Sequence, residues 1–410
     1  MDARAPYDVE AIRAQFPILS TRPYGRPLVY LDNAASAQKP RAVVERMVAA
    51  YEREYANVHR GLHFLANAAT EAFEASREQV RRFLGAGSAD EIVFTRSATE
   101  AFNLVAYGLG LSTIREGDEI LLSTMEHHSN IVPWHFLRER RGAVLKWIEV
   151  DDDGAIDIDA YARQLTDRTK VVAITQMSNV LGAAPPVAEM ARLAREAGAL
   201  VVVDGSQGAV HLDVDVRALG CDFYVVTGHK LYGPTGIGAL WGRPEALDAL
   251  PPFNGGGEMI AEVTRERVTY AAPPHRFEAG TPPIVEAIGL GAALDWMEGV
   301  GRDAIRAHEA ALTRRAHDAL SRVPGLRIFG NAPGKGPIVS FELGNAHAHD
   351  VATVIDRMGV AVRAGTHCAQ PLLARFGVTS TCRASFAAYN TAQEIDALAA
   401  ALERARALFA

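Results

Sequence analysis

The sequence predicts an α/β protein in which a large domain with a mainly parallel sheet is followed by a smaller α+β domain. Three observations support this prediction. The chain has 410 residues, more than a single hydrophobic core usually organises. Short apolar, β-branched runs alternate with helix-like segments through the first two thirds of the chain, as in parallel sheets. Near residue 290 this alternation gives way to two long helical patterns.

The middle of the chain contains a βαβ unit. Residues 169–175 (TKVVAIT) are predicted to form a buried strand, 187–198 (VAEMARLAREAG) an amphipathic helix closed by glycine, and 199–204 (ALVVVD) the next buried strand. Residues 222–227 and 238–241 continue the strand pattern. Ligands bind at the carboxyl ends of strands in such sheets, so the polar residues that follow these strands are the candidates for chemistry.

The last third of the chain is expected to form the smaller domain. Its predicted helices are 284–301, 303–320, 350–359 and 392–409, and its predicted strands lie within 336–343, 359–365 and 382–390. The segment 275–283 (HRFEAGTPP) combines turn formers with charges and is predicted to be an exposed loop. We divide the chain into an N-terminal segment (1–24) that packs with the small domain, a large domain (25–290) and a small domain (291–410).

Composition and charge exclude several classes of protein. Hydrophobic residues make up 49% and charged residues 22% of the chain, which is typical of globular proteins. The 42 Lys and Arg residues against 49 Asp and Glu residues give a net charge of -7, the wrong sign for binding phosphate backbones. The sequence shows no apolar stretch of signal-peptide or membrane-spanning length. We therefore expect a cytoplasmic protein with no nucleic-acid or membrane partner.

A lysine and an aspartate follow two of the predicted strands. Lys230 lies in TGHKLYGPTGIG, and Asp204 ends VVVD, with Gln207 three residues later. A lysine at a buried strand exit is either a surface residue on a loop or an amine whose pKa is lowered by burial, so that it can form a Schiff base. An acid for a pyridinium nitrogen and an amine for an aldehyde are the two groups that pyridoxal phosphate requires.

Two further segments fit the same cofactor. Residues 95–108 (TRSATEAFNLVAYG) predict a strand end, a small-residue turn and a helix start, where free N–H groups and the helix dipole favour an anion. A plain helix cap would give the same pattern. His127 and His128 follow the predicted strand 118–124, and one ring could stack on a pyridine face, although a structural role is the simpler interpretation.

The three cysteines are too few for a disulfide framework and lack CxxC spacing, and we predict no metal site. Cys221 begins an apolar run and is interpreted, like Cys382, as a packing residue. Cys368 lies in RAGTHCAQP, five residues after Arg363, where positive charge would stabilise a thiolate. From composition alone, both an inert and a reactive Cys368 remain possible.

Ten motifs in order resemble the Suf-type cysteine desulfurases, which are fold-type I pyridoxal phosphate enzymes of the class V aminotransferase group. The motifs are LDNAASAQKP, VHRGLH, RSATEAFNLVA, EHHSNIVPW, SNVLG, VDGSQ, TGHKLYGPTGIG, RFEAGTP, RAGTHCAQP and CRASFAAYN. The resemblance extends from about Phe16 to about Asn390. The resemblance implies a fold-type I transferase whose large domain has a mainly parallel seven-stranded sheet and whose small C-terminal domain carries the catalytic cysteine loop.

The resemblance also assigns roles to individual residues. It implies that Lys230 binds pyridoxal 5'-phosphate covalently, that Asp204 pairs with the pyridinium nitrogen, that Gln207 contacts the phenolic oxygen and that His127 stacks on the ring. It places phosphate contacts on Ala98, Thr99, Thr227 and His229, and on Thr281 from the other subunit of a homodimer. It assigns the substrate carboxylate to Arg383, Asn179 and Arg363, and makes Cys368 the nucleophile that takes the sulfur, with Arg363 or His367 as candidates to stabilise its thiolate.

The activity implied is conversion of L-cysteine to L-alanine, with sulfur passed as a persulfide on Cys368 to an acceptor protein of the Suf system for iron-sulfur cluster assembly. Selenocysteine lyase activity at the same site, an aminotransferase and a non-catalytic scaffold are the alternatives. The family often has two histidines before the cysteine, whereas this chain has Thr366 and His367, so a role for a histidine at 366 is not carried over. The HAHD segment (347–350) is interpreted as a solvated loop rather than as part of a metal site shared with a partner.

Overall fold

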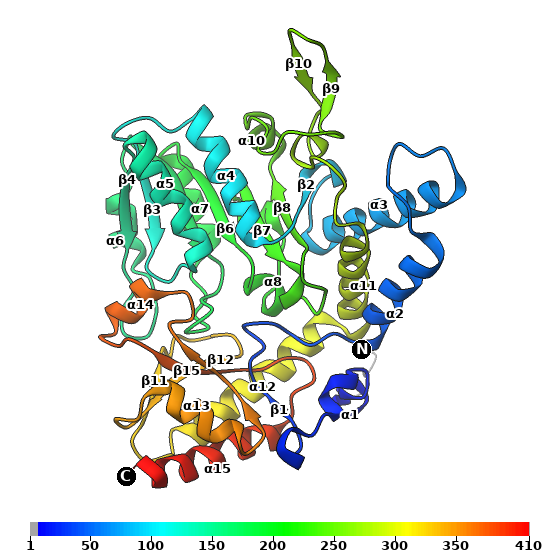
Figure 1. Cartoon of the computed structure of the whole chain (residues 1–410). Coiled ribbons are helices and arrows are strands. Elements are labelled where there is room, and N and C mark those ends of the chain that lie inside the picture. Colours follow the sequence, from blue (N-terminus) through cyan, green and yellow to red (C-terminus); the bar gives the residue numbers. More distant parts are fainter. Residues whose placement is uncertain (1–6, 410) are drawn as a thin grey trace, which may run out of the picture.

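The computed structural model describes residues 7–409, so residues 1–6 of the proposed N-terminal segment and residue 410 lie outside the described range. Figure 1 shows a larger part built on one sheet with helices on both faces, and a smaller part that contains the C-terminal helix. None of the helices in residues 7–409 combines the length and the apolarity that a membrane crossing requires.

The larger part is organised by a seven-stranded sheet with the order β2-β8-β7-β6-β5-β3-β4. Its strands, in sheet order, are β2 (Ile92–Thr95), β8 (Gly238–Gly242), β7 (Phe223–Thr227), β6 (Leu200–Asp204), β5 (Thr169–Thr175), β3 (Glu119–Ser123) and β4 (Val144–Ile148). Only β8 runs antiparallel to its neighbours in this sheet, so the predicted mainly parallel sheet is confirmed. The prediction that the parallel pattern continues through β8 is wrong, because the connection 228–237 is too short for a parallel crossover.

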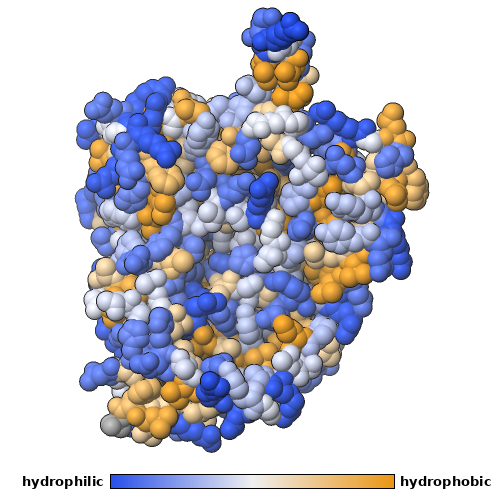
Figure 2. All heavy atoms as spheres, in the orientation of Figure 1, coloured by the Kyte–Doolittle hydropathy of each residue, from blue (hydrophilic) through white to orange (hydrophobic). Residues whose placement is uncertain are grey.

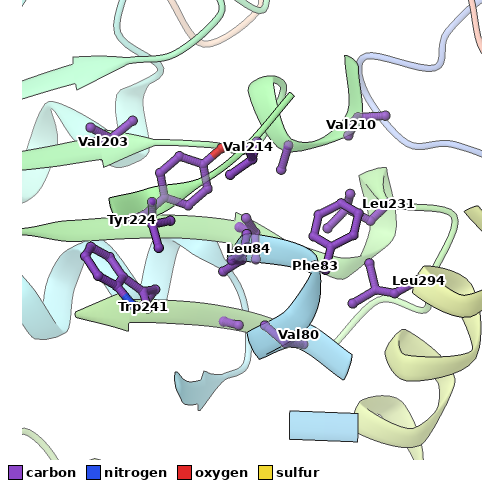
Figure 3. Close-up of a cluster of buried hydrophobic side chains, with 14 of the residues drawn as sticks. Val80, Phe83, Leu84, Val203, Val210, Val214, Tyr224, Leu231, Trp241 and Leu294 are labelled. Carbon is purple, nitrogen blue, oxygen red and sulfur yellow. The ribbon is translucent and has the colours of Figure 1, made fainter. Parts of the chain in front are cut away.

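Alternating side chains of the central strands enter two separate cores. On β6, Val201 and Val203 belong to one buried cluster and Val202 to the other. Because successive side chains of a strand point to opposite faces, both faces of the sheet must be covered by helices. Figure 3 shows one of these clusters, to which Val203 and Tyr224 of the sheet and Phe83 all belong.

The helices of the larger part divide between these two cores. Helices α4 (Ala98–Ser112), α5 (Val132–Arg141) and α10 (Pro244–Asp248) cover one face. The other core includes residues of α2 (Arg41–Ala49), α3 (Phe64–Leu84), α6 (Ile158–Gln164), α7 (Val187–Glu196), α8 (Gly208–His211), α9 (Val216–Leu219) and α11 (Ile284–Val300). A hairpin of β9 (Ile260–Val263) and β10 (Val268–Tyr270) projects from the larger part, as Figure 1 shows.

The smaller part has a four-stranded antiparallel sheet with the order β11-β12-β15-β14. These strands are β11 (Leu326–Phe329), β12 (Ile338–Leu343), β15 (Thr381–Ser385) and β14 (Arg363–Gly365), and the helices are α12 (Arg302–Leu320), α13 (Ala348–Asp356), α14 (Gln370–Arg375) and α15 (Ala392–Phe409). The single strand predicted at 359–365 is divided, because β13 (Val360–Ala361) pairs in parallel with β1 (Val29–Tyr30) instead.

The N-terminal helix α1 (Val9–Arg13) belongs to a segment that contacts the smaller part. The Tyr7 hydroxyl donates a 2.7 Å hydrogen bond to the carbonyl of Ala388, and Arg13 Nη1 lies 2.9 Å from Glu394 Oε1. Helix α11 continues without interruption past residue 290 and packs against α2 and α3, so the division at that residue falls inside a helix. The three-part division of the chain stays a proposal.

The segment 275–283 differs from the exposed loop that we predicted. Phe277 is buried, and Glu278 forms an ion pair with the buried Arg77 in which Oε1 and Nη1 lie 2.6 Å apart. Glu278 also accepts a hydrogen bond from the Phe94 amide of β2. A buried charge requires such partners, and they hold the first half of the segment against the sheet, whereas Thr281 is exposed.

Candidate active site

A cavity of about 750 Å³ lies where the carboxyl edge of the large sheet faces the smaller part. Of the residues predicted from the sequence, it is lined by Ala98, Thr99, His127, Asn179, Asp204, Thr227, His229, Lys230, Arg363, Cys368 and Arg383. Gln207 and Thr281 do not line it. The buried side chain of Gln207 donates a hydrogen bond to the Ala34 carbonyl (2.8 Å), and Ala34 does line the cavity.

Asp204 and Lys230 come from neighbouring parallel strands. Asp204 is the last residue of β6, and Lys230 lies in the 3-10 turn η6 (Gly228–Lys230) that follows β7. The Ser206 amide donates to Asp204 Oδ1 (2.8 Å), which fixes the carboxylate. Burial lowers the pKa of Lys230 to about 8, although the negative charge of Asp204 opposes this shift. The amine is therefore partly neutral near physiological pH and can act as a nucleophile or a base.

The start of α4 forms one corner of the cavity. Ser97 caps this helix by accepting a hydrogen bond from the Glu100 amide, while the first amides of a helix have no partner within it. Gly238 of β8 lies so close that a Cβ there would be 2.7 Å from the backbone carbon of Ser97, so only glycine fits. The hydroxyls of Thr99 and Ser129 lie 2.7 Å apart, and Ser129 is a cavity residue that we did not predict. Free amides, hydroxyls and a helix dipole suit a phosphate group.

His127 presents a neutral ring to the cavity. Its Nδ1 accepts a hydrogen bond from the Ser129 amide (3.1 Å), which leaves Nε2 as the site of any proton on the neutral ring. Burial lowers the pKa of His127 to about 3, helped by the positive charge of Lys230. Burial and Lys230 likewise lower the pKa of His229 to about 4. An uncharged aromatic ring can stack on the face of a heterocycle.

Cys368 lies in a turn in which two residues other than glycine adopt left-handed backbone geometry. His367 has φ 51° and Cys368 has φ 55°. The turn is tied to the larger part, because the His128 amide donates to the Cys368 carbonyl (2.7 Å) and Asn179 Nδ2 donates to the His367 carbonyl (2.8 Å). Such strain persists only where neighbouring contacts impose it. Cys368 is exposed within the cavity wall, and this turn sets its position.

The other two cysteines are packing residues, as predicted. Cys221 and Cys382 are both buried, with 3% and 2% of their surface exposed. Burial raises the pKa of Cys382 to about 12, and it raises the pKa of Cys221 as well. Neither thiol supplies a useful thiolate at neutral pH.

Arg383 of β15 is a buried cation with unused hydrogen-bonding capacity. Its Nη1 donates to the Asn179 carbonyl (2.9 Å), and its Nη2 lies 3.6 Å from Asp32 Oδ1. Within residues 7–409 its buried Nε has no partner. Burial lowers the pKa of Arg383 to about 10, so the guanidinium remains charged. A charged guanidinium group that lines a cavity fits a carboxylate ligand.

The two groups that we named as candidates to stabilise the Cys368 thiolate are occupied elsewhere. Arg363 Nη2 lies 2.6 Å from Asp32 Oδ2 in an ion pair. His367 Nε2 lies 2.9 Å from Thr381 Oγ1, and burial together with the charge of Arg383 lowers the pKa of His367 to about 3. His367 is therefore a neutral ring that supports the turn. Asp32, which holds both arginines, was not among our candidates.

The HAHD segment is more ordered than the solvated loop that we predicted. His347 caps helix α13, and its Nδ1 accepts a hydrogen bond from the His349 amide (3.3 Å). Both rings line the cavity. Within the described residues, no group of three or more His, Cys, Asp or Glu side chains is placed to hold a metal ion.

The sheet order and the cavity together define an α/β enzyme with a lysine and an aspartate at adjacent strand exits. The chain belongs to the class V aminotransferase family, whose model matches residues 29–398. Within that family it belongs to the cysteine desulfurases, as the order of its motifs predicted. It is 51% identical over 409 residues to a probable cysteine desulfurase of Streptomyces coelicolor, with 98% of each chain covered. It is also 51% identical over 399 residues to a cysteine desulfurase of Dickeya dadantii, with 97% of each chain covered.

The same relationship is seen among solved structures. The cysteine desulfurase CsdA of Escherichia coli matches with a TM-score of 0.92 and 42% identity, over 98% of this chain and 100% of that chain. A cysteine desulfurase of Thermococcus onnurineus matches with a TM-score of 0.92 and 37% identity, over 98% and 99% of the two chains. The fold-type I architecture predicted from the sequence is therefore confirmed.

Proposed function

We propose that the protein is a pyridoxal phosphate-dependent cysteine desulfurase, which converts L-cysteine to L-alanine and carries the sulfur on Cys368 as a persulfide. One observation supports this proposal above the others: the exposed thiol of Cys368 lines the same cavity as Lys230 and Asp204. An aminotransferase needs the lysine and the aspartate but no thiol.

The donor set of the cavity fits the cofactor. Lys230 would hold its aldehyde carbon, Asp204 its ring nitrogen, and the amides and hydroxyls at the start of α4 its phosphate. His127 would lie against the ring, whereas the contacts proposed for Gln207 and Thr281 depend on groups that do not line the cavity. When bound, pyridoxal phosphate supplies an electron sink for the negative charge that develops next to the substrate Cα.

The remaining chemistry belongs to the side chains of this chain. Arg383 binds the substrate carboxylate through its guanidinium group, next to Asn179. Lys230 Nζ takes the proton from the substrate Cα, because its lowered pKa makes the neutral amine available. The Cys368 thiolate then attacks the substrate sulfur, so that a sulfur–sulfur bond forms and the carbon–sulfur bond breaks. The electron pair of the broken bond stays on the substrate carbon, which takes up a proton and leaves as part of alanine.

Product analysis tests this proposal. With cofactor, L-cysteine and a thiol reductant, we expect equal amounts of alanine and sulfide, and a mass increase of one sulfur atom on Cys368 when the reductant is omitted. An aminotransferase would instead release a keto acid and leave Cys368 unmodified. L-selenocysteine, assayed beside L-cysteine, shows whether the same cavity also releases selenium. Keto acid as the main product from cysteine would refute the desulfurase proposal.

We further propose that the enzyme works in the cytoplasm as a homodimer and passes sulfur to a Suf-type acceptor protein for iron-sulfur cluster assembly. The exposed apolar surface supports the dimer: Leu62 is 100% and Phe64 is 80% exposed, and α2 exposes Val44 and Val48. Figure 2 shows hydrophobic patches over α2 and the loop that precedes α3. Exposed apolar surface of this kind is typical of a subunit interface. The exposed Thr281 is then free to reach the phosphate site of a second copy.

We expect the protein to sediment as a dimer and the double variant Leu62→Asp/Phe64→Asp to sediment as a monomer, because carboxylates without a partner are costly in an apolar interface. The monomer should bind cofactor at least about tenfold more weakly, since it lacks the partner contact from Thr281. Leu408→Asp, a change at another exposed leucine, is the control and should leave the dimer intact. A parent protein that is monomeric and fully active at assay concentration would contradict the proposed homodimer.

A further inference from the structure

Glu126 is a completely buried carboxyl group that the proposed mechanism does not use. It has no exposed surface and lies between the end of β3 and the turn η5 (His128–Asn130). The next two residues reach the two reactive parts of the cavity. His127 lines the cavity beside Lys230, and His128 contacts the Cys368 turn.

Three hydrogen bonds from different parts of the fold converge on the Glu126 carboxyl group. Ser123 Oγ at the end of β3 lies 2.5 Å from Oε1, and the Thr175 amide at the end of β5 donates to the same oxygen (2.7 Å). Asn130 Nδ2 donates to Oε2 (2.7 Å). The indole N–H of Trp134 donates to Asn130 Oδ1 (3.1 Å), and because an indole is only a donor, it fixes the orientation of the Asn130 amide.

Each of the two side-chain oxygens of Glu126 must therefore accept a hydrogen bond. The Thr175 amide faces Oε1 and the Asn130 NH₂ group faces Oε2, and neither group can accept a hydrogen bond. This requirement holds whether or not Glu126 carries a proton. Burial raises the pKa of Glu126 to about 8, and the negative charge of Asp204 adds to this shift. Thr175 pairs in register with Asp204, so the same contact ties Glu126 to the strand that carries the proposed partner of the cofactor.

The segment that follows Glu126 contacts the turn that carries Cys368. The His128 amide donates to the Cys368 carbonyl (2.7 Å), and the Gln370 amide approaches His128 Nε2 (3.4 Å). Cys368 and its preceding residue have positive φ angles, so the turn would relax without such contacts.

We infer that Glu126 is a positioning residue that fixes, through one short segment, both the His127 ring at the cofactor site and the Cys368 turn. The inference rests on the proposed desulfurase function only for the roles of His127 and Cys368. The buried carboxyl group beneath the cavity thus fixes the position of the nucleophile relative to the cofactor site. A change at this one group is therefore expected to affect both half-reactions.

Glu126→Gln tests this inference, because a glutamine has one oxygen and its NH₂ group must oppose either Thr175 or Asn130. In the cofactor-free protein we expect backbone amide exchange in 126–130 and 365–370 to become about tenfold faster. In the loaded enzyme we expect kcat/KM for cysteine to fall by about tenfold, the effect of one buried hydrogen bond that is lost and leaves its donor unsatisfied.

The double variant Glu126→Gln/Asn130→Asp should restore both quantities to within about threefold of the parent values, because it exchanges the amide and the carboxylate and makes every contact donor to acceptor. Glu119→Gln is the matched control. Glu119 is also buried and lies at the opposite end of β3, where it is bonded to Lys146 and Thr166. It should lower the thermal unfolding midpoint without faster exchange at 365–370.

Parent-like exchange at 365–370 in Glu126→Gln, or failure of the double variant to restore it, would overturn the inference. Should Glu126→Gln not fold, Ser123→Ala is measured instead. It removes one donor from Oε1 and should raise exchange at 365–370 by about threefold, and unchanged exchange in that variant would likewise overturn the inference. Exchange is measured without cofactor or substrate, so its outcome is independent of whether the enzyme proves to be a desulfurase.

Discussion

Cys368→Ala should lower the rate of alanine formation from cysteine by at least about a hundredfold, the range expected when a catalytic nucleophile is removed. The variant should still bind the cofactor, and added cysteine should still change its absorption spectrum. Those steps depend on Lys230, Asp204 and Arg383, which lie on other elements of the cavity. The two halves of the reaction should therefore fail separately.

The measurements are alanine by chromatography, persulfide by intact mass and the visible spectrum during a cysteine titration. Cys221→Ala and Cys382→Ala are the matched controls, because both thiols are buried and neither lines the cavity. They should keep the turnover of the parent protein while losing on the order of 1 kcal/mol of stability. If Cys368→Ala makes alanine at the parent rate with an acceptor present, sulfur capture by this thiol is wrong.

The parts of the site that follow buried strands could be predicted from the sequence. Asp204 and Lys230 come at the ends of short apolar runs, and parallel strands bring their carboxyl ends to one edge of a sheet. The start of α4 was likewise indicated by the small residues after a strand. The predicted positions of these residues at strand ends agree with the structure, because each prediction depends on local patterning and on one general property of parallel sheets.

Other parts depend on contacts between residues far apart in the chain. Asp32 and Arg363 are separated by 331 positions, and nothing in the residues near Asp32 indicates that it pairs with an arginine of the smaller part of the fold. The hydrogen bond from the Thr175 amide to Glu126, across 49 positions, is likewise not indicated by the sequence. The direction of β8 was missed for another reason: its apolar run carries no information on strand direction, and the short connection 228–237, which excludes a parallel crossover, was not considered.

The Cys368 turn could not be predicted for a different reason. Left-handed backbone geometry is usually indicated by glycine or asparagine, and His367 and Cys368 are neither. Contacts from His128 and Asn179 impose the geometry. The neutral state of His367 could not be predicted either. It follows from the burial of the ring, which lowers its pKa, and the surrounding polar sequence does not indicate that burial.

Lys230→Ala should abolish covalent attachment of the cofactor and reduce turnover by at least about a thousandfold, since the variant loses both the attachment point and the proposed base. Weaker, non-covalent binding should persist through Asp204 and the start of α4. Borohydride reduction followed by peptide mass analysis should find the cofactor on Lys230 in the parent protein and on no lysine in the variant.

Two measurements test Lys230, rather than the nearby Lys39, as the lysine that binds the cofactor: the pH dependence of covalent binding and the position of the borohydride label. A lysine with a pKa of about 8 becomes neutral as the pH rises through 8, so the rate at which the apo-protein binds the cofactor covalently should rise with pH and level off above that value. Burial also lowers the pKa of Lys39 to about 8, but Lys39 Nζ donates to the His229 carbonyl (3.0 Å) and does not line the cavity. Lys39→Met should therefore keep the borohydride label on Lys230. A label that appears on Lys39 in Lys230→Ala, at a rate comparable to that of the parent protein, would show that the cavity does not select Lys230 for cofactor attachment.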